Sequence, residues 1–308
     1  MCTGPSVARP KMVIDLPATV AFRLGGTLSE VDHIHWTDER PTLRRPVLVL
    51  AFEGWNDAGD AASTAARHIA DGLGAEPFAE IDPEIFYDFT DARPSVVIED
   101  GERALSWPLN EFSAAQLPTL DHDLIIGIGI EPQLRWRTYS EQVINLAKAF
   151  DCSMVVSLGA LIADVAHSRP TTIFGSTDNS ELGRRLDLEP STYEGPTGIV
   201  GVIHSAFRDQ DVDSVSLWAS VPSYVPHASS PKAALALVDR LGTMLGLPIL
   251  AGELVEATVE YESQITELVS EDDETRAYVA QLEARYDSMT PESSAAFIEE
   301  LERFLEDK

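Results

Sequence analysis

The stretch PVLVLAFEGWNDAGDAASTAARHIA, residues 46–70, contains the pattern from which we predict the fold. No polar residue interrupts Val47–Phe52, which is typical of a strand buried on both faces of a parallel sheet. Small and apolar residues then recur at helical spacing as far as Ile69, and Asn56 or Asp57 could cap this helix. The polar turn between strand and helix should therefore lie at the carboxyl edge of a sheet, where open α/β sheets bind ligands.

That turn, EGWNDAG at residues 53–59, lacks the known phosphate-binding signatures. Its spacing fits neither G-x-G-x-x-G nor G-x-x-x-x-G-K-[ST], which excludes a dinucleotide fingerprint and a P-loop. Gly54 and Gly59 could serve turn geometry alone. However, Trp55 lies close in sequence to three acids, Glu53, Asp57 and Asp60, at one strand end, which favours a ligand site. Both interpretations are compatible with this stretch.

Composition limits the class of partner. The chain has 308 residues, enough for one large domain or two unequal ones, and a net charge of −29 at pH 7. Such a charge repels phosphate backbones and anionic lipid, so we expect no nucleic acid and no membrane as partner. Cys2 and Cys152 are too few for a disulfide framework. Neither a secretory leader nor a long apolar run is visible, so the expected location is the cytoplasm.

Further strand and helix patterns alternate along the chain and indicate an α/β fold. The strongest strands are Leu124–Ile130, Ser153–Leu158 and Val215–Val221. A hairpin at about residues 95–107, with Asp-Gly at its turn, interrupts the alternation as an insertion. We expect a lead-in over residues 1–45, a core domain over 46–248 and an acidic helical subdomain over 249–308.

Chemically useful side chains follow several of these strands. Glu131, Arg135 and Trp136 follow the second central strand, and a loop with His167 and Arg169 follows the third. Thr197 and Gly198 precede a helix whose free amides could hold an anion, although this is also a common tight connection. His33 and His35 form an H-x-H pair without a third ligand nearby, so no metal site is expected.

Taken together, these loops resemble the bacterial branch of the proteasome-assembly-chaperone-like family. The resemblance is carried by FEGWNDAGDAAS from residue 52, GIEPQLRW from 129, GALIADVAHSRP from 159, PTGIVG from 196 and SLWASVPSYV from 216. The family tends to have Pro and Thr where this chain has Ala166 and Ser168. The resemblance implies a three-layer α/β/α core of the purine-nucleoside-phosphorylase and hydrolase type. It further implies a trimer helped by the inserted hairpin, and C-terminal helices that cover the pocket as a lid.

Two functions from different classes fit these observations. One is a non-catalytic assembly or interaction protein, which the absence of a nucleophile elbow, metal cluster or triad spacing favours. The alternative is a small-molecule hydrolase or phosphorylase-like enzyme that needs no cofactor. In that enzyme Asp57 or Glu131 would be the general acid or base, and His167 a second proton-transfer group. The ligand would contact residues from four loops: Gly54, Trp55, Asn56, Arg135, Trp136, Arg169, Thr197 and Gly198.

Overall fold

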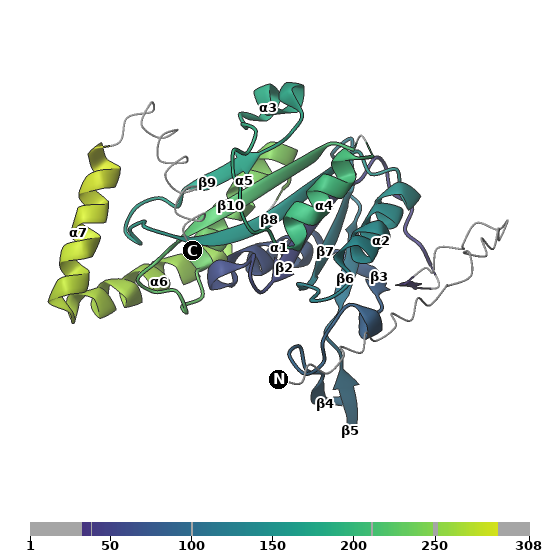
Figure 1. Ribbon diagram of the computed structural model, residues 1–308, viewed down its shortest axis with the longest axis horizontal. Coiled ribbons are helices and arrows are strands. Elements are labelled where there is room, and N and C mark those ends of the chain that lie inside the picture. The colour runs from purple at the N-terminus through teal and green to yellow at the C-terminus, as the bar shows by residue number, and fades with distance from the viewer. Residues whose placement is uncertain (1–32, 38, 100, 211, 249–251, 289–308) are drawn as a thin grey trace, which may run out of the picture. The chain divides into compact units, whose positions relative to one another are not determined.

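The computed structural model describes residues 33–37, 39–99, 101–210, 212–248 and 252–288. An eight-stranded sheet forms the centre of this part, in the order β1-β3-β6-β7-β2-β8-β10-β9 (Figure 1). Its strands are β1 (Ile34–Trp36), β2 (Val47–Glu53), β3 (Glu76–Ile81), β6 (Asn110–Ala115), β7 (Leu124–Ile130), β8 (Met154–Ala163), β9 (Ile173–Ser176) and β10 (Ser214–Pro222).

The four inner strands, β7, β2, β8 and β10, run parallel, and the outer strands pair antiparallel. β2 lies between β7 and β8, with Glu53 opposite Ile130 and Ala51 opposite Leu158. Six of its seven residues are buried, as its apolar sequence predicts. The turn after β2 and the turn after β7 therefore leave the sheet side by side at its carboxyl edge.

Helices cover both faces of the sheet (Figure 1). One core cluster joins α1 and α5 to one face, and a second cluster joins α2 and α4 to the other. This is the expected three-layer α/β/α architecture. The helices are α1 (Ala61–Leu73), α2 (Trp136–Ala149), α3 (Ser180–Leu186), α4 (Ile199–Arg208), α5 (Pro231–Leu245), α6 (Gly252–Ser270) and α7 (Asp273–Ser288), with short 3₁₀ turns η1 (Ala58–Asp60) and η2 (Pro83–Ile85).

Helix starts were predicted with mixed success. Ser230 caps α5 through its hydroxyl, with a proline in the first turn, as expected. Serine is a common N-cap, so the sequence predicts Ser140 as the cap of α2 and Ser270 as the cap of α7. Both predictions are wrong. α2 begins at Trp136, and Ser140 lies one turn inside it, where its hydroxyl donates to the Trp136 carbonyl. Ser270 is the last residue of α6, and the Asp272 carboxylate accepts from an amide of the first turn of α7. For α4 the sequence predicts Thr197 as the N-cap, but the N-cap is Gly198.

The inserted hairpin is present as β4 (Ser95–Glu99) and β5 (Glu102–Ser106), which form a separate two-stranded sheet. The sequence did not predict β6, because NEFSAA has small and polar residues where a buried strand normally has branched ones. Phe112 of β6 fills the space left by Gly127 of β7, where a β-carbon would lie only 2.7 Å from the ring. Tertiary packing therefore makes this segment a strand.

The C-terminal helices pack on two core loops. Tyr261 and Ile265 of α6 and Leu282 of α7 form a small apolar cluster with Ala166 and Val225 of the core. The sequence also predicts a third C-terminal helix, from Thr290-Pro291 through Leu305, but this segment lies outside the described residues, as does most of the lead-in. No helix in the described ranges combines the length and apolar character needed to cross a membrane.

Candidate functional site

A hydrogen-bonded network joins three loops at the carboxyl edge of the sheet. The Asn56 side-chain amide donates to Glu131 Oε1 at 2.8 Å, and the Ile199 backbone amide donates to the same oxygen at 2.8 Å. The Glu131 amide in turn donates to the Glu53 carbonyl at 2.9 Å. The ends of β2 and β7 and the start of α4 are thus held together by one carboxylate.

This network changes the interpretation of the α4 N-terminus. The anion at its first amide is Glu131 itself, a favourable place for a negative charge. A β-carbon at Gly198 would lie 2.5 Å from Asn56 Oδ1 and 2.7 Å from Glu131 Oε1, so glycine allows this close approach. Asn56 is 1% exposed, and within the described residues its Oδ1 has no hydrogen-bond partner.

Asp57 serves the first helix. Its Oδ1 accepts from the Ala62 amide at 2.6 Å, and both carboxylate oxygens lie 3.3 Å from the Ser63 amide. Burial raises the pKa of Asp57, and these hydrogen bonds oppose that rise. The N-cap position of α1 is Asp60 and not Asn56 or Asp57, but the Asp57 carboxylate accepts from the first-turn amides, so its oxygens face that helix.

The other predicted residues of this edge lie further out. Trp55 is 63% exposed, and Gly54 and Thr197 are exposed too. Arg135 is exposed and has a φ of +54°. Trp136 is partly buried, and its indole donates to the Pro132 carbonyl.

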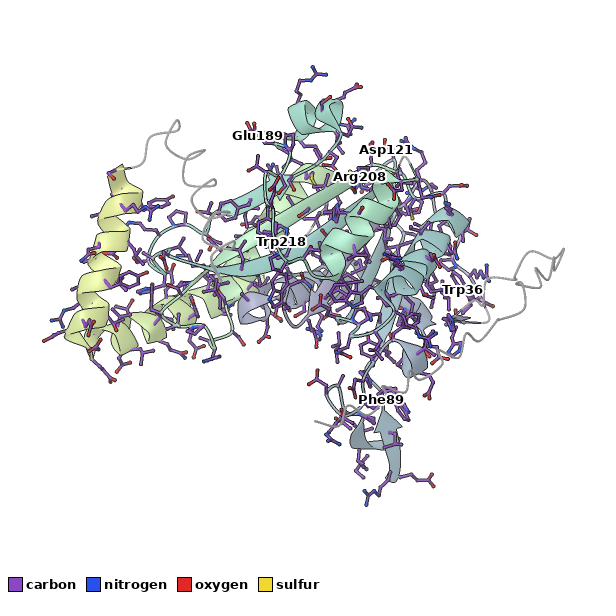
Figure 2. The ribbon with its side chains drawn as sticks, in the orientation of Figure 1. Trp36, Phe89, Asp121, Glu189, Arg208 and Trp218 are labelled. Carbon is purple, nitrogen blue, oxygen red and sulfur yellow. The ribbon has the colours of Figure 1, made fainter. Side chains whose placement is uncertain are left out.

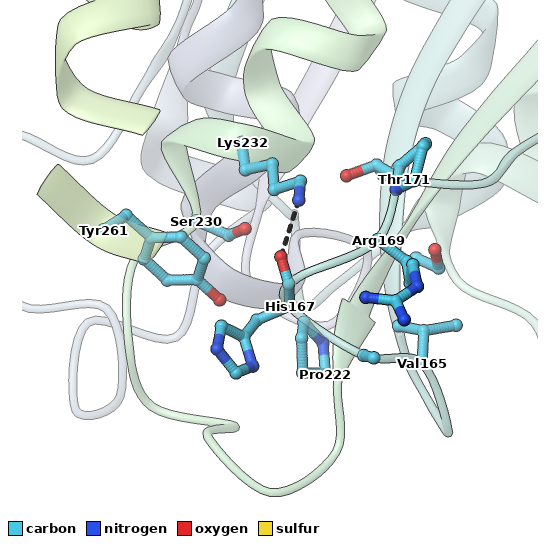
Figure 3. Close-up of a pocket in the computed structure, with 11 residues that line it drawn as sticks. Val165, His167, Arg169, Thr171, Pro222, Ser230, Lys232 and Tyr261 are labelled. Atoms are coloured by element: carbon cyan, nitrogen blue, oxygen red, sulfur yellow. Dashed lines mark hydrogen bonds between the residues drawn. The ribbon is translucent and has the colours of Figure 1, made fainter. Parts of the chain in front are cut away.

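His167 lies in a separate small pocket with Arg169, Ser230, Lys232 and Tyr261 (Figure 3). The pocket volume is about 10 Å³, which is near the minimum that holds one water molecule. Asn56 and Glu131 are not among its lining residues. Asp57 and Glu131 thus follow the ends of β2 and β7. His167, the third candidate catalytic residue, lies in a pocket that Tyr261 of α6 also lines.

The hydrogen bonds of His167 fix its tautomer. The Thr266 hydroxyl donates to the Glu262 carbonyl, so Nε2 of His167 must donate to Thr266 Oγ1 across 3.0 Å. Nδ1 then accepts from the Tyr224 hydroxyl at 2.7 Å, and that hydroxyl also accepts from the His167 amide. Burial, followed by the nearby Lys232 charge, lowers the pKa of His167. The ring is thus neutral and uses both nitrogens within the protein.

Arg169 and Lys232 connect the core to the C-terminal helices. Arg169 forms a two-pronged pair with the Asp287 carboxylate of α7, with both N–O distances 2.7 Å, and approaches Glu283. Lys232 donates to the His167 carbonyl at 2.5 Å and pairs with Glu262 of α6. Arg169 therefore forms ion pairs with α7, and Lys232 forms one with α6.

Sequence reasoning missed several of these groups. Tyr224 lies within the stretch SLWASVPSYV, but none of Tyr224, Lys232 and Thr266 was predicted as a site residue, and only their contacts with His167 distinguish them. It also missed a larger groove of about 490 Å³, lined by Arg45, His122, Met154, Arg185 and Met244. In the part of the chain that the structure describes, no group of three or more His, Cys, Asp or Glu side chains could hold a metal ion.

The comparisons with known proteins identify the family. The PAC2 family model matches residues 51–269. The chain belongs to the PAC2 family. A PAC2 family protein from Streptomyces avermitilis is 42% identical, with a TM-score of 0.72, and covers 76% of this chain and 99% of its own.

Two Mycobacterium tuberculosis structures are also similar to this PAC2 protein. A proteasome-assembly chaperone homologue is 40% identical, with a TM-score of 0.69, and covers 76% of this chain and 99% of its own. A protein of unknown function is 28% identical, with a TM-score of 0.76 and coverages of 89% and 96%. No curated protein matches. The family resemblance predicted from the loop motifs is thus confirmed.

Proposed function

We propose that this PAC2 protein is a non-catalytic assembly or interaction protein that associates with itself and binds a protein partner. One observation carries the proposal: the three candidate catalytic side chains form hydrogen bonds that support the fold, and they do not share one pocket. Glu131 Oε1 holds Asn56 and the α4 amide, Asp57 accepts from first-turn amides of α1, and His167 uses both ring nitrogens. His167 lies in a pocket that neither Asp57 nor Glu131 lines, so a proton-transfer pair of His167 with either carboxylate is not assembled.

The relatives support this class of function. One M. tuberculosis relative is described as a proteasome-assembly chaperone homologue, which names a protein-binding role for that protein. For the present chain we infer only the general role, an interaction protein located in the cytoplasm. The same proposal divides the chain into a lead-in over residues 1–45, a core domain over 46–248 and a helical subdomain over 249–308. In this division α6 and α7 form a lid over the His167 pocket.

The self-contact proposed here is the β4–β5 hairpin. Val96, Ile98 and Leu105 are 53%, 67% and 56% exposed. Val96 lies opposite Leu105 in the antiparallel register, and Ile98 is two residues further along, so all three share one face. Phe89 lies near the base of the hairpin (Figure 2). Its ring packs edge-on against Trp107, which follows β5. An isolated two-stranded sheet is marginal in water, so we propose that this face is covered by neighbouring copies in a homotrimer.

The test is the molar mass of the intact chain by light scattering. The wild type should have the mass of three chains, and the double variant Val96→Thr, Ile98→Lys should have the mass of one. The matched control is Ser106→Lys, which places the same charge on the opposite face and should leave the trimer intact. A wild type that has the mass of a single chain refutes the self-association.

The non-catalytic assignment has its own test. Native protein should contain no co-purified metabolite by mass spectrometry, and cross-linking in cells should capture a protein partner. A bound metabolite that is lost on Glu131→Gln substitution would instead support the enzyme.

A further inference from the structure

Three parts of the chain meet at the His167 pocket. Tyr261 belongs to α6, and Ser230 and Lys232 lie at the start of α5. His167 and Arg169 lie in the loop after β8. Figure 3 shows the polar ends of Tyr261, Ser230 and Lys232 grouped around the His167 backbone. The pocket volume of about 10 Å³ is too small for an organic ligand, but it is close to the space that one water molecule needs.

The Tyr261 hydroxyl needs a hydrogen-bond partner in this pocket. Tyr261 is 6% exposed, and among the described residues its hydroxyl has no such partner. Burial raises the pKa of Tyr261, and the nearby Ser230 hydroxyl lowers it. The two hydroxyls are thus close together, yet no direct hydrogen bond of normal length and angle joins them. Because a buried hydroxyl without a partner is costly, a small polar molecule between the two would stabilise the fold.

Two neighbouring groups have hydrogen atoms to donate. The Lys232 ammonium has three N–H groups and uses one for the His167 carbonyl and one for Glu262. The Ser230 hydroxyl accepts from the Ala233 amide, and in the part of the chain that the structure describes its own hydrogen has no acceptor. Together with the Tyr261 hydroxyl, these groups favour a molecule that accepts hydrogen bonds.

The charges around the pocket are already balanced, which selects a neutral molecule. Lys232 pairs with Glu262, and Arg169 pairs with Asp287. Burial lowers the pKa of His167, so its ring is neutral. A chloride ion or a carboxylate would therefore bring an uncompensated charge into a mostly buried site. Water fits the volume, the charge and the available donors.

We propose that one water molecule occupies the His167 pocket and links α6 to the core. It bridges the hydroxyls of Tyr261 and Ser230 and accepts from the Lys232 ammonium. Such a bridge is nearly as favourable as a direct hydrogen bond. The water lies beside the apolar cluster that Tyr261 forms with Ala166 and Val225, so the C-terminal helices dock through both apolar and water-mediated contacts. This binding site does not depend on the interaction role proposed above, and its failure would leave that role unaffected.

A crystal structure of the intact chain at about 1.8 Å resolution or better tests the site directly. A solvent peak should lie within about 2.6–3.2 Å of Tyr261 Oη, and at the same distance from Ser230 Oγ or Lys232 Nζ. A crystal soaked in sodium bromide should show no anomalous peak at this position, because the site is neutral. The absence of the solvent peak overturns the proposal, as does a direct hydrogen bond between the two hydroxyls. An anomalous bromide peak would identify an anion site instead.

The Tyr261→Phe variant tests whether the water stabilises the contact between α6 and the core. This variant keeps the ring and removes the hydroxyl, so its melting temperature should fall by about 1–4 °C. Tyr286→Phe is the matched control, because Tyr286 of α7 is 37% exposed, and its melting temperature should equal that of the wild type. A Tyr261→Phe variant as stable as the wild type, or more stable, would mean that the hydroxyl is buried unpaired and would overturn the proposed link.

Discussion

Gly198 is the residue on which the carboxyl-edge network depends most. Gly198→Ala should lower the free energy of unfolding by about 1–3 kcal/mol, because the new methyl group displaces Asn56 and Glu131 from their hydrogen bonds. Gly72→Ala, at an exposed position of α1 with no atom near the new β-carbon, should instead raise the free energy of unfolding by roughly 1 kcal/mol. Urea unfolding measures both changes. Equal effects of the two variants would contradict this role of Gly198.

His204 should make stability depend on pH. Its Nε2 lies 2.7 Å from Ser157 Oγ of β8, and burial lowers the pKa of His204 from 6.5 to about 4. The unfolded chain therefore binds the extra proton first, so this contribution is complete above pH 6.5 and is lost as pH falls toward 4. The loss reaches about 3 kcal/mol at most.

His204→Gln keeps a hydrogen-bonding partner for Ser157 but does not titrate. The decrease in unfolding free energy between pH 7 and pH 4.5 should thus be smaller in this variant than in the wild type. Urea titrations at both pH values give the comparison, and carboxylates common to the two proteins cancel. An identical decrease would show that His204 does not titrate differently on folding.

At the scale of elements, the buried strands were predictable because their apolar runs are continuous. Val47–Glu53 and Leu124–Ile130 match the expected segments almost residue for residue. The end of β8 was not predictable. Its pattern suggested a stop at Leu158, but pairing with β10 continues it to Ala163. Five further residues carry the chain about 16 Å onward. This is why His167 belongs to a pocket under α6 and not to the Asn56–Glu131 network.

The contact between α7 and the core should depend on Arg169. Arg169→Ala removes the pair with Asp287 and the approach to Glu283, so hydrogen exchange should accelerate in residues 273–288 while the sheet stays protected. Global stability should change by only about 1 kcal/mol or less, since this pair is partly solvated. Arg276→Ala is the control, because Arg276 pairs with Asp273 within α7 itself. Equal exchange in the two variants would mean that Arg169 does not dock α7.

At the scale of the whole molecule, net charge should make self-association depend on salt. Copies that each carry −29 repel one another, so raising sodium chloride from about 0.05 M to about 0.5 M should strengthen self-association. Sedimentation velocity measures this effect. Self-association that weakens with salt would argue for attractive ion pairs between copies.

The central position of β2 also has a consequence for how the chain is made. Val47 pairs with Leu124 on one side and with Met154 on the other, so both neighbours follow it by a long interval. At ordinary translation speeds, roughly 5–20 s separate the synthesis of β2 from that of β8. Until β7 is made both edges of this apolar strand are open, and until β8 is made one edge stays open; open apolar strands aggregate readily. We therefore expect chaperones that cover open strand edges to bind this chain during its synthesis.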